Sequence, residues 1–561
     1  MPGGPQEEKP GIYFLSNHFF REGIMKPLLK AIFLFLFLAL LFPRGPRASD
    51  ICNETVNTEE GPVVGKAVDN KAACVWKGIP YARPPVGNLR WRPPQPPLKR
   101  DNTYQAYEFS AACIQEHKMA SGGESESISE DCLYLNIWRP RKEGKFPVMY
   151  WIYGGGFRSG AGSWEMFNGA NLAASQDVVV VTINYRVGPF GFLALPELAR
   201  EDPDGSTGVY GLRDQIRGLK WVKNNIANFG GDPDNVTVFG QSAGAHSVFF
   251  LLGSPQAKGL FHRAIPMSGN CDFGITMKDA YRTGDYYAEE AGCRGPDRLA
   301  CLRGKSPSEL TMKSKNQIVD ALSGGEYKFF PAVDGHVVPD YPVNLMRKGE
   351  YNKVPIMVGH TKDEVRLYTI MFPAFSLTPR WFVEWAIKKT AGPIYDRVFD
   401  LYSYKEFKTP SHLLMRVAND AYIAQGVMAA EAADEVPVYL YRFDWNETRF
   451  PNKLGAFHGI DIPFVFGNFD LGSDIAKMVA DKKTFAKAAP LSKTVSSYYA
   501  NFARTGDPNG EGLPPWPQYE NGDPHRIIMD TETRAEKISK KQMQRYKLFF
   551  EYTMTEIRNI H

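Results

Sequence analysis

Two patterns of hydrophobic residues alternate along this chain. Residues 148–153 and 178–185 form short, largely continuous apolar runs, which are typical of strands buried on both faces of a sheet. After the second run, apolar residues recur at helical spacing at Leu212, Ile216, Leu219, Val222, Ile226 and Phe229. This succession of strand, helix and further strand predicts an α/β fold with a mostly parallel, doubly wound central sheet flanked by helices.

A serine between two glycines follows the next predicted strand. Residues 235–239 are β-rich, residues 245–252 are apolar with helical character, and the segment Gly240-Gln241-Ser242-Ala243-Gly244 lies between them. In the sharp strand-to-helix turn of a nucleophile elbow, a Cβ on either side of the serine would collide with the neighbouring strand or helix. The segment therefore predicts that the hydroxyl of Ser242 projects beyond the edge of the sheet.

An elbow serine is a weak nucleophile unless a histidine takes its proton and an acid orients that histidine. Two later loops supply both groups in the order Ser, acid, His that this arrangement uses. Residues 354–358 predict a strand that leads to Asp363 and Glu364, and residues 436–443 predict a strand that leads to His458.

A glycine triplet follows the strand predicted at residues 148–153. Gly154, Gly155 and Gly156 would let backbone N–H groups approach a ligand closely, where a developing oxyanion needs donors. A flexible loop is the alternative. The position of the triplet, directly after a buried strand and upstream of the elbow, favours the oxyanion hole.

Together these segments resemble the type-B carboxylesterases, the large α/β-hydrolase family that includes cholinesterases, insect juvenile hormone esterases and bile-salt lipases. The resemblance runs from about residue 61 to residue 549. It includes the glycine triplet, the elbow, the His458 loop, Gly78-Ile79-Pro80-Tyr81-Ala82 and Glu130-Asp131-Cys132-Leu133-Tyr134-Leu135-Asn136.

This resemblance implies a serine esterase that forms an acyl-enzyme and needs neither a metal nor an organic cofactor. It implies that Ser242 is the nucleophile, Glu364 the acid and His458 the base. The oxyanion-hole donors would be the N–H groups of Gly155, Gly156 and Ala243.

The chain has seven cysteines, so an oxidising compartment allows at most three disulfides. The resemblance implies one between Cys113 and Cys132 and one between Cys293 and Cys301. For the remaining three cysteines, a bridge from Cys52 to Cys74 is open, and Cys271 is the candidate for a free thiol.

The N-terminus predicts export. Lys26 and Lys30 precede an apolar run at residues 31–42, which is too short to span a bilayer comfortably, and a signal peptide is expected within residues 1–48, with translation starting at Met25. Secretion is the prediction, and a signal anchor in the secretory pathway is the alternative. The sequons at Asn53 and Asn446 predict glycosylation, whereas the one at Asn235 opens a predicted strand.

The composition is that of one large globular domain. Of 561 residues, 43% are hydrophobic, and 66 basic against 62 acidic residues leave a net charge of +4 without a long basic block. Nucleic acid is therefore not expected as a partner, and no membrane span is predicted beyond the signal segment. Without repeats or low-complexity linkers, residues 49–561 are predicted to form one catalytic domain, whose oligomeric state stays open.

Several polar residues near the predicted site have simpler explanations than catalysis. Asp363 lies beside Glu364, but the family pattern assigns the acid role to the second carboxylate, so a loop or cap role is expected for Asp363. His246 and His360 do not follow the acid in the chain, and each is expected to be a satisfied core histidine or a surface one. Arg186 and Asp214 are expected to form a buried structural ion pair or hydrogen bond.

The substrate is predicted to be a neutral, hydrophobic ester. Cholinesterases bind a quaternary ammonium against a glutamate beside the nucleophile and on aromatic faces, whereas this chain has Gln241 in place of that glutamate. Aromatic residues are also absent between Cys113 and Cys132, and Leu367 precedes the first aromatic after the acid, Tyr368.

Two alternatives stay open. Gln241 and the pattern Gly455-x-x-His458-x-x-Asp461 also fit juvenile hormone esterases, so an esterase selective for a hormone or a pheromone is one alternative. The other is a catalytically inactive, cholinesterase-like adhesion protein, because such relatives keep the fold. They usually lack the serine or the base, and both are present here.

Overall fold

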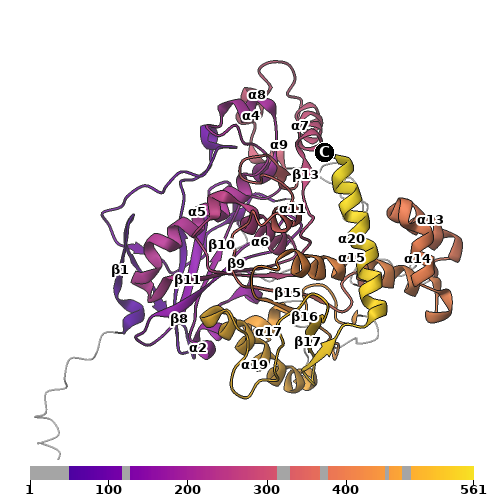
Figure 1. Ribbon diagram of the computed structural model, residues 1–561. Coiled ribbons are helices and arrows are strands. Elements are labelled where there is room, and N and C mark those ends of the chain that lie inside the picture. Colours follow the sequence, from indigo (N-terminus) through magenta and orange to yellow (C-terminus); the bar gives the residue numbers. More distant parts are fainter. Residues whose placement is uncertain are drawn as a thin grey trace, which may run out of the picture. The chain divides into compact units, whose positions relative to one another are not determined.

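One large mixed sheet positions the segments identified above. The structure is a computed structural model that describes residues 50–115, 127–311, 329–366, 377–448, 454–469 and 482–560. Within these residues, eleven strands pair in the order β18-β17-β16-β15-β12-β11-β9-β10-β8-β4-β3 (Figure 1). Their bounds are β3 (Lys66–Ala67), β4 (Ala73–Pro80), β8 (Tyr134–Pro140), β9 (Phe146–Ile152), β10 (Val179–Ile183), β11 (Gly231–Gln241), β12 (Arg263–Met267), β15 (Ile356–Thr361), β16 (Val438–Phe443), β17 (His525–Met529) and β18 (Arg534–Lys537).

The centre of this sheet is parallel and its margins are antiparallel. Strands β10, β9, β11, β12, β15, β16 and β17 each pair in parallel with the next, whereas β18, β8, β4 and β3 pair antiparallel with their neighbours. Every residue of β9 and β10 is buried, as expected for apolar strands covered on both faces. The predicted α/β class is confirmed.

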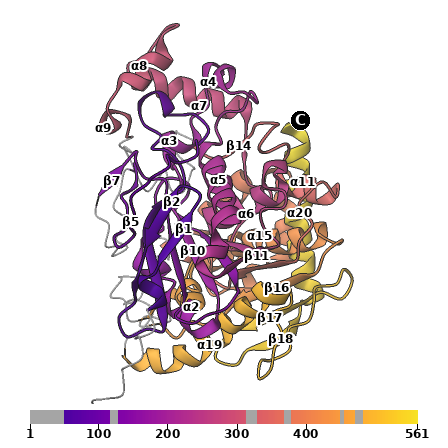
Figure 2. The same cartoon turned by 90° about the vertical axis from the view of Figure 1, so that its left-hand side faces the viewer.

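Helices cover both faces of the sheet. Helices α5 (Tyr210–Asn225) and α6 (Ala243–Gly253) pack on one face, and α2 (Ala170–Gln176) and α19 (Lys482–Thr505) pack on the other (Figure 1, Figure 2). Helix α5 is the one predicted by the apolar spacing that begins at Leu212. The residues of that spacing are buried, and its last two, Ile226 and Phe229, lie in the 3₁₀ turn that follows the helix.

The remaining helices form the periphery and the C-terminal part. They are α3 (Gly188–Phe192), α4 (Pro196–Glu201), α7 (Met277–Glu290), α8 (Arg298–Gly304), α9 (Pro307–Leu310), α11 (Pro342–Arg347), α13 (Arg380–Ala391), α14 (Tyr395–Leu401), α15 (Pro410–Ala432), α17 (Ile462–Phe466) and α20 (Lys540–Ile560). In the part of the chain that the structure describes, none of the helices is both long enough and apolar enough to cross a bilayer.

Three disulfides tie loops to this framework. They join Cys52 to Cys74, Cys113 to Cys132 and Cys293 to Cys301, and Cys271 is a buried free thiol. Two of these bridges are the pairs that the resemblance implied. Contacts group Ile51–His561 into one compact unit. The predicted signal segment lies outside the described residues.

Candidate active site

The predicted site residues follow the carboxyl ends of neighbouring strands. Ser242 follows β11, the glycine triplet follows β9, and the loops that hold Glu364 and His458 follow β15 and β16. These strands belong to the parallel part of the sheet, so their carboxyl ends share one edge. Segments more than two hundred residues apart in sequence thus meet at the edge where ligands of such sheets bind.

The elbow has the backbone that its glycines predicted. Ser242 has φ +58° and ψ −123°, a conformation that is strained for a residue with a Cβ. A Cβ on Gly240 would lie 2.7 Å from the carbonyl oxygen of Ile152, and one on Gly244 would overlap that oxygen. The N–H of Ser242 donates to the carbonyl of Met267 at 2.9 Å, which fixes the turn against β12.

The glycine loop offers backbone donors beside the elbow. Gly155 has φ +115°, and a Cβ there would overlap the carbonyl oxygen of Ser159, so only glycine fits. Ala243 is the first residue of α6, where N–H groups have no partner within the helix. Among the described residues, no hydrogen bond uses the N–H of Gly155, Gly156 or Ala243. These groups are therefore free to donate to a ligand.

A buried carboxylate orients the imidazole of His458. Oε2 of Glu364 lies 2.5 Å from Nδ1 of His458, and the Glu364 side chain is only 1% exposed. Its other oxygen, Oε1, accepts hydrogen bonds from the N–H of Thr361 at 2.7 Å and from the hydroxyl of Ser268 at 2.6 Å. Because a carboxylate can only accept, the short contact places a proton on Nδ1. This arrangement leaves Nε2 as the nitrogen that faces the elbow.

Nε2 of His458 is held by the residue before the serine. The side-chain amide nitrogen of Gln241 lies 3.0 Å from Nε2, so with the proton on Nδ1 the amide donates and Nε2 accepts. In the described part of the chain, no hydrogen bond joins the hydroxyl of Ser242 to His458. Such bonds often tighten only when substrate is bound. The imidazole thus lies at the elbow as a neutral acceptor, and Gln241 competes with the hydroxyl of Ser242 for its Nε2.

The surroundings of His458 stabilise its protonated form relative to an isolated imidazole. Burial lowers the pKa of His458, but the charge and hydrogen bond of Glu364 outweigh burial, and the net effect raises that pKa above its usual value. Burial raises the pKa of Glu364, but His458 and the hydrogen bond from Ser268 lower it overall. Asp461 also favours the imidazolium, although burial raises the pKa of Asp461 itself to about 7. An imidazolium formed during a reaction is therefore stabilised here.

Sequence reasoning missed two residues that support the pair. Ser268 follows β12 directly, is fully buried and donates to Glu364 from a backbone with φ +54°. Tyr422 of α15 donates to the carbonyl of Ser268 at 2.9 Å, and its ring packs edge-on against His458 with the centroids 5.9 Å apart. A serine at the carboxyl end of a sheet strand was the one available signal for Ser268.

The competing residues have other roles. Asp363 accepts from the N–H of Ala456 at 3.0 Å and so ties the acid loop to the histidine loop, as expected of a loop ligand. His360 is buried, and its Nε2 lies 3.3 Å from the carbonyl oxygen of Gly269. Arg186 and Asp214 form a fully buried ion pair at 2.7 Å.

His246 differs from expectation. It is buried as a core histidine would be, but among the described residues neither ring nitrogen has a hydrogen-bond partner, so it is not satisfied there. Its ring stacks on Phe273 with the centroids 4.1 Å apart. Burial, the first cause, lowers the pKa of His246 to about 3, which keeps the ring neutral. Stacking on an aromatic ring stands in for the polar partner that the sequence led us to expect.

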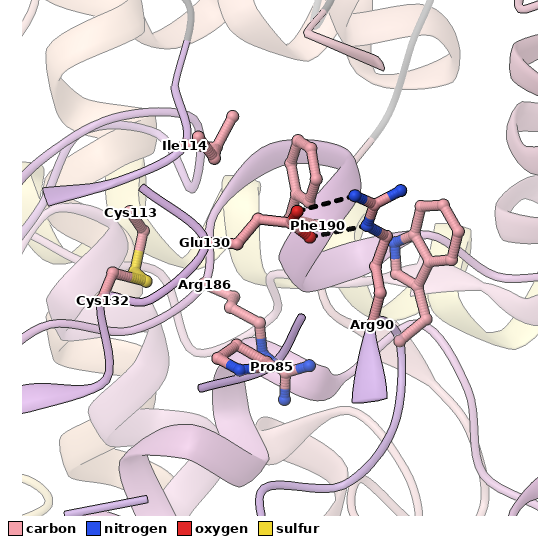
Figure 3. A pocket seen from close by; sticks show the side chains of 9 residues that line it. Pro85, Arg90, Cys113, Ile114, Glu130, Cys132, Arg186 and Phe190 are labelled. Carbon is pink, nitrogen blue, oxygen red and sulfur yellow. Dashed lines mark hydrogen bonds and ion pairs between the residues drawn. A yellow bond between two sulfur atoms is a disulfide. The ribbon is translucent and has the colours of Figure 1, made fainter. Parts of the chain in front are cut away.

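A small pocket beside the Cys113–Cys132 bridge contains charged side chains that are paired, Arg90 with Glu130 and Arg186 with Asp214. It is lined by Pro85, Arg90, Trp91, Cys113, Ile114, Glu130, Cys132, Arg186 and Phe190 (Figure 3). Arg90 and Glu130 form a two-pronged ion pair, with both hydrogen bonds at 2.6 Å. The segment from Glu130 to Asn136, identified in the sequence, therefore anchors the chain beside the Cys113–Cys132 bridge. Within the described residues, no cluster of His, Cys, Asp or Glu has the geometry of a metal site.

Comparisons with known proteins agree with this geometry. The model of the carboxylesterase family matches residues 53–548. The chain is 36% identical over 507 residues to para-nitrobenzyl esterase of Bacillus subtilis, covering 89% of this chain and 99% of that protein. It is 35% identical over 522 residues to a liver carboxylesterase of Sus scrofa, covering 83% of this chain and 87% of that protein.

Solved structures agree as well. A structure of PNB esterase superposes with a TM-score of 0.77 at 34% identity, covering 88% of this chain and 99% of that one. A carboxylesterase of Geobacillus stearothermophilus superposes with a TM-score of 0.76 at 35% identity and the same coverage. These relatives are esterases, and they favour neither the hormone-selective nor the inactive alternative.

Proposed function

The chain belongs to the carboxylesterase family and is a serine hydrolase of carboxylic esters, and we propose that Ser242, Glu364 and His458 carry out its catalysis. The observation that carries this assignment is the 2.5 Å contact between Glu364 and Nδ1 of His458, which leaves the opposite ring nitrogen facing the elbow. The order of the three residues is also that of the fold.

The proposed reaction has two acyl-transfer steps. Nε2 of His458 exchanges Gln241 for the hydroxyl of Ser242 and takes its proton while the serine oxygen bonds to the ester carbonyl carbon. The same nitrogen then gives this proton to the leaving alcohol, and an acyl-enzyme on Ser242 remains. Water repeats the sequence and releases the acid. Glu364 stabilises the imidazolium without itself taking the proton.

We assign the oxyanion hole to the backbone N–H groups of Gly155, Gly156 and Ala243. Their positions support this role, because the first two lie in the loop after β9 and the third begins α6 beside the serine. The N-terminus of α6 adds a favourable dipole for negative charge. Donors fixed in the backbone need no rearrangement when charge develops on the carbonyl oxygen.

We propose that the alcohol group of the substrate is neutral and hydrophobic. Gln241, which is 5% exposed, contributes no charge at the position where cholinesterases have a glutamate. The segments that would supply the other choline contacts lie partly outside the described residues, at 116–126 and 367–376. A quaternary ammonium would gain little here and would lose its hydration.

A matched pair of esters tests this preference. Acetylcholine and 3,3-dimethylbutyl acetate have nearly the same shape, but only the first is charged. We expect kcat/KM for the neutral ester to equal or exceed that for acetylcholine, because no carboxylate attracts the cation. Steady-state kinetics with both esters decide the question. A preference for acetylcholine of about tenfold or more, the size of a good cation–π site, would contradict it.

The contact between Gln241 and His458 predicts a change in the pH profile. In Gln241→Glu, a carboxylate beside Nε2 should stabilise the imidazolium and raise the pKa of His458 further. The neutral base would then be lost at a higher pH, so the acidic limb of kcat/KM should move to higher pH by the same amount. Initial rates across pH at constant ionic strength measure it.

The control for this prediction is Gln241→Met, which removes the amide without adding charge. Its acidic limb should move less than that of Gln241→Glu. An equal movement in both variants would mean that the lost amide contact, and not the added charge, sets the basicity of His458.

We further propose that residues 49–561 form a secreted catalytic domain behind a signal segment at residues 1–48. The three disulfides and the similarity to liver carboxylesterases are consistent with the secretory pathway. For glycosylation we propose Asn53 and Asn446, whose side chains are exposed. Asn235 lies within β11, and its side-chain amide donates to the carbonyl of Arg504, which makes it a poor acceptor.

A further inference from the structure

Helix α13 and Leu377, which lies just before it, expose an unusual concentration of large apolar side chains. The exposed fractions are 82% for Leu377, 68% for Trp381, 36% for Phe382 and 51% for Trp385. We call these four residues the Trp381 surface. The other large apolar residues exposed in the described chain, Val86, Leu98 and Ile128, are scattered along the sequence. Scattered exposed residues are normal, whereas a cluster marks an interaction site.

The Trp381 surface is not the side of the helix that packs on the protein. Val383, Ile387 and Ala391 recur every four residues and are buried, and they form the packed side. Trp381 and Trp385 lie four residues apart and so align on another side of the helix, and Leu377 lies three residues before the helix begins at Arg380. Figure 1 shows α13 and α14 at the outer margin, beyond α20. The helix therefore packs on the protein through its aliphatic side, and its aromatic side faces solvent.

The aromatic side chains support one another at the surface. The ring centroids of Phe382 and Trp385 are 5.3 Å apart, and those of Trp381 and Phe382 are 5.9 Å apart. This packing holds two indole rings outward while they remain in contact with solvent.

Positive charge follows the aromatic cluster. Lys388 and Lys389 lie exposed in the last turn of α13, and neither forms an ion pair within the described residues. The ammonium of Lys389 lies 5.2 Å from the ring centroid of Trp385. Arg380 is neutralised by Glu384 at 2.7 Å, so the unpaired charge of the helix is that of the two lysines.

We propose that the Trp381 surface docks this protein on anionic lipid bilayers. Tryptophan prefers the boundary between water and hydrocarbon, and adjacent lysines attract acidic head groups. A partner protein fits less well, because lysine is depleted at protein interfaces. Two copies paired about a twofold axis would bring like charges together. With twelve residues, α13 is too short to span a bilayer and would lie in its interface. The proposal does not depend on the catalytic assignment.

Vesicle sedimentation with the whole purified chain tests the proposal. The vesicles contain phosphatidylcholine with about a third of phosphatidylserine, which mimics an acidic membrane surface. We expect the wild-type protein to sediment with these vesicles. The Trp381→Ser/Trp385→Ser variant should bind them at least about tenfold more weakly. Lys388→Glu/Lys389→Glu and added salt should each weaken binding by a similar factor. All variants share one N-terminus, so its apolar run contributes equally.

The controls distinguish binding through the Trp381 surface from nonspecific binding to vesicles. Leu98→Ser removes another exposed apolar side chain, 63% exposed, and Lys220→Glu/Lys278→Glu makes the same charge change on α5 and α7. Both should bind like wild type, and every variant should hydrolyse a soluble ester at the wild-type rate if it is folded. Equal binding by the tryptophan variant, or no binding by wild type, would overturn the proposal. Self-association that the tryptophan variant abolishes, without vesicle binding, would overturn it in favour of a second copy.

Discussion

Replacing Ser242 with alanine is expected to lower kcat for a neutral ester by about 10⁶-fold while the fold stays intact. The reason is that alanine has no side-chain oxygen, so the acyl-enzyme bond cannot form. His458→Ala should cost a similar factor, because an elbow hydroxyl keeps its proton at neutral pH unless a base removes it. Since the residues act as a unit, the double variant should be hardly slower than either single one. Single-turnover and steady-state rates measure these losses.

The matched control for this experiment is Ser254→Ala. Ser254 caps the other end of α6 and is buried, and its hydroxyl has no hydrogen-bond partner in the described part of the chain. The substitution is chemically identical to Ser242→Ala but is distant along the helix, so near-normal activity is expected. Ser242→Ala with activity close to wild type, on protein purified free of other esterases, would show that another residue is the nucleophile.

Glu364→Gln is expected to lower kcat by about 10⁴-fold. An amide in place of the carboxylate turns an NH₂ group either toward Nδ1 of His458 or toward Ser268 and Thr361, which all donate in the present network. The imidazole would then lose both the tautomer that exposes a basic Nε2 and the negative charge that stabilises its protonated form. Steady-state kinetics at the pH optimum of each variant measure the loss.

Asp363→Asn is the control, because it changes the neighbouring carboxylate in the same way. Asp363 ties two loops together through Ala456, and among the described residues no hydrogen bond joins it to His458, so the activity lost in Asp363→Asn should be far smaller. If Asp363→Asn lost as much activity as Glu364→Gln, the claim that Glu364 is the carboxylate that orients His458 would be contradicted.

The sequence predicted those features that local chemistry determines. Gly240 and Gly244 are required by the close approach of Ile152, and this requirement is visible as a spacing in the chain. The apolar runs of β9 and β10 identified the buried strands. The loops that hold the site residues were then expected at one edge of the sheet, because the carboxyl ends of parallel strands lie at the same edge.

Strand ends were less predictable where buried residues are polar. A strand was expected at 354–358, whereas β15 extends from Ile356 to Thr361. His360 and Thr361 pair in the sheet with Arg442 and Phe443 and are buried, although their polarity suggested a loop. Tertiary burial decides such cases, and a single sequence does not contain it.

Contacts between distant side chains were not predictable at all. Ser268 reaches Glu364 across 96 positions, and Gln241 reaches His458 across 217. His246 was expected to have a polar partner and instead stacks on Phe273. Each outcome depends on rotamers set by neighbours from several elements, which no local pattern encodes.

The most direct test of the central claim is covalent labelling with a dialkyl p-nitrophenyl phosphate. Attack by a serine oxygen forms an O–P bond and expels p-nitrophenolate, so each labelled chain gains one dialkylphosphoryl group. We predict a single adduct that peptide mass spectrometry locates on Ser242, with labelling greatly slowed in His458→Ala. An adduct on another residue, or equally fast labelling without His458, would contradict the proposed triad.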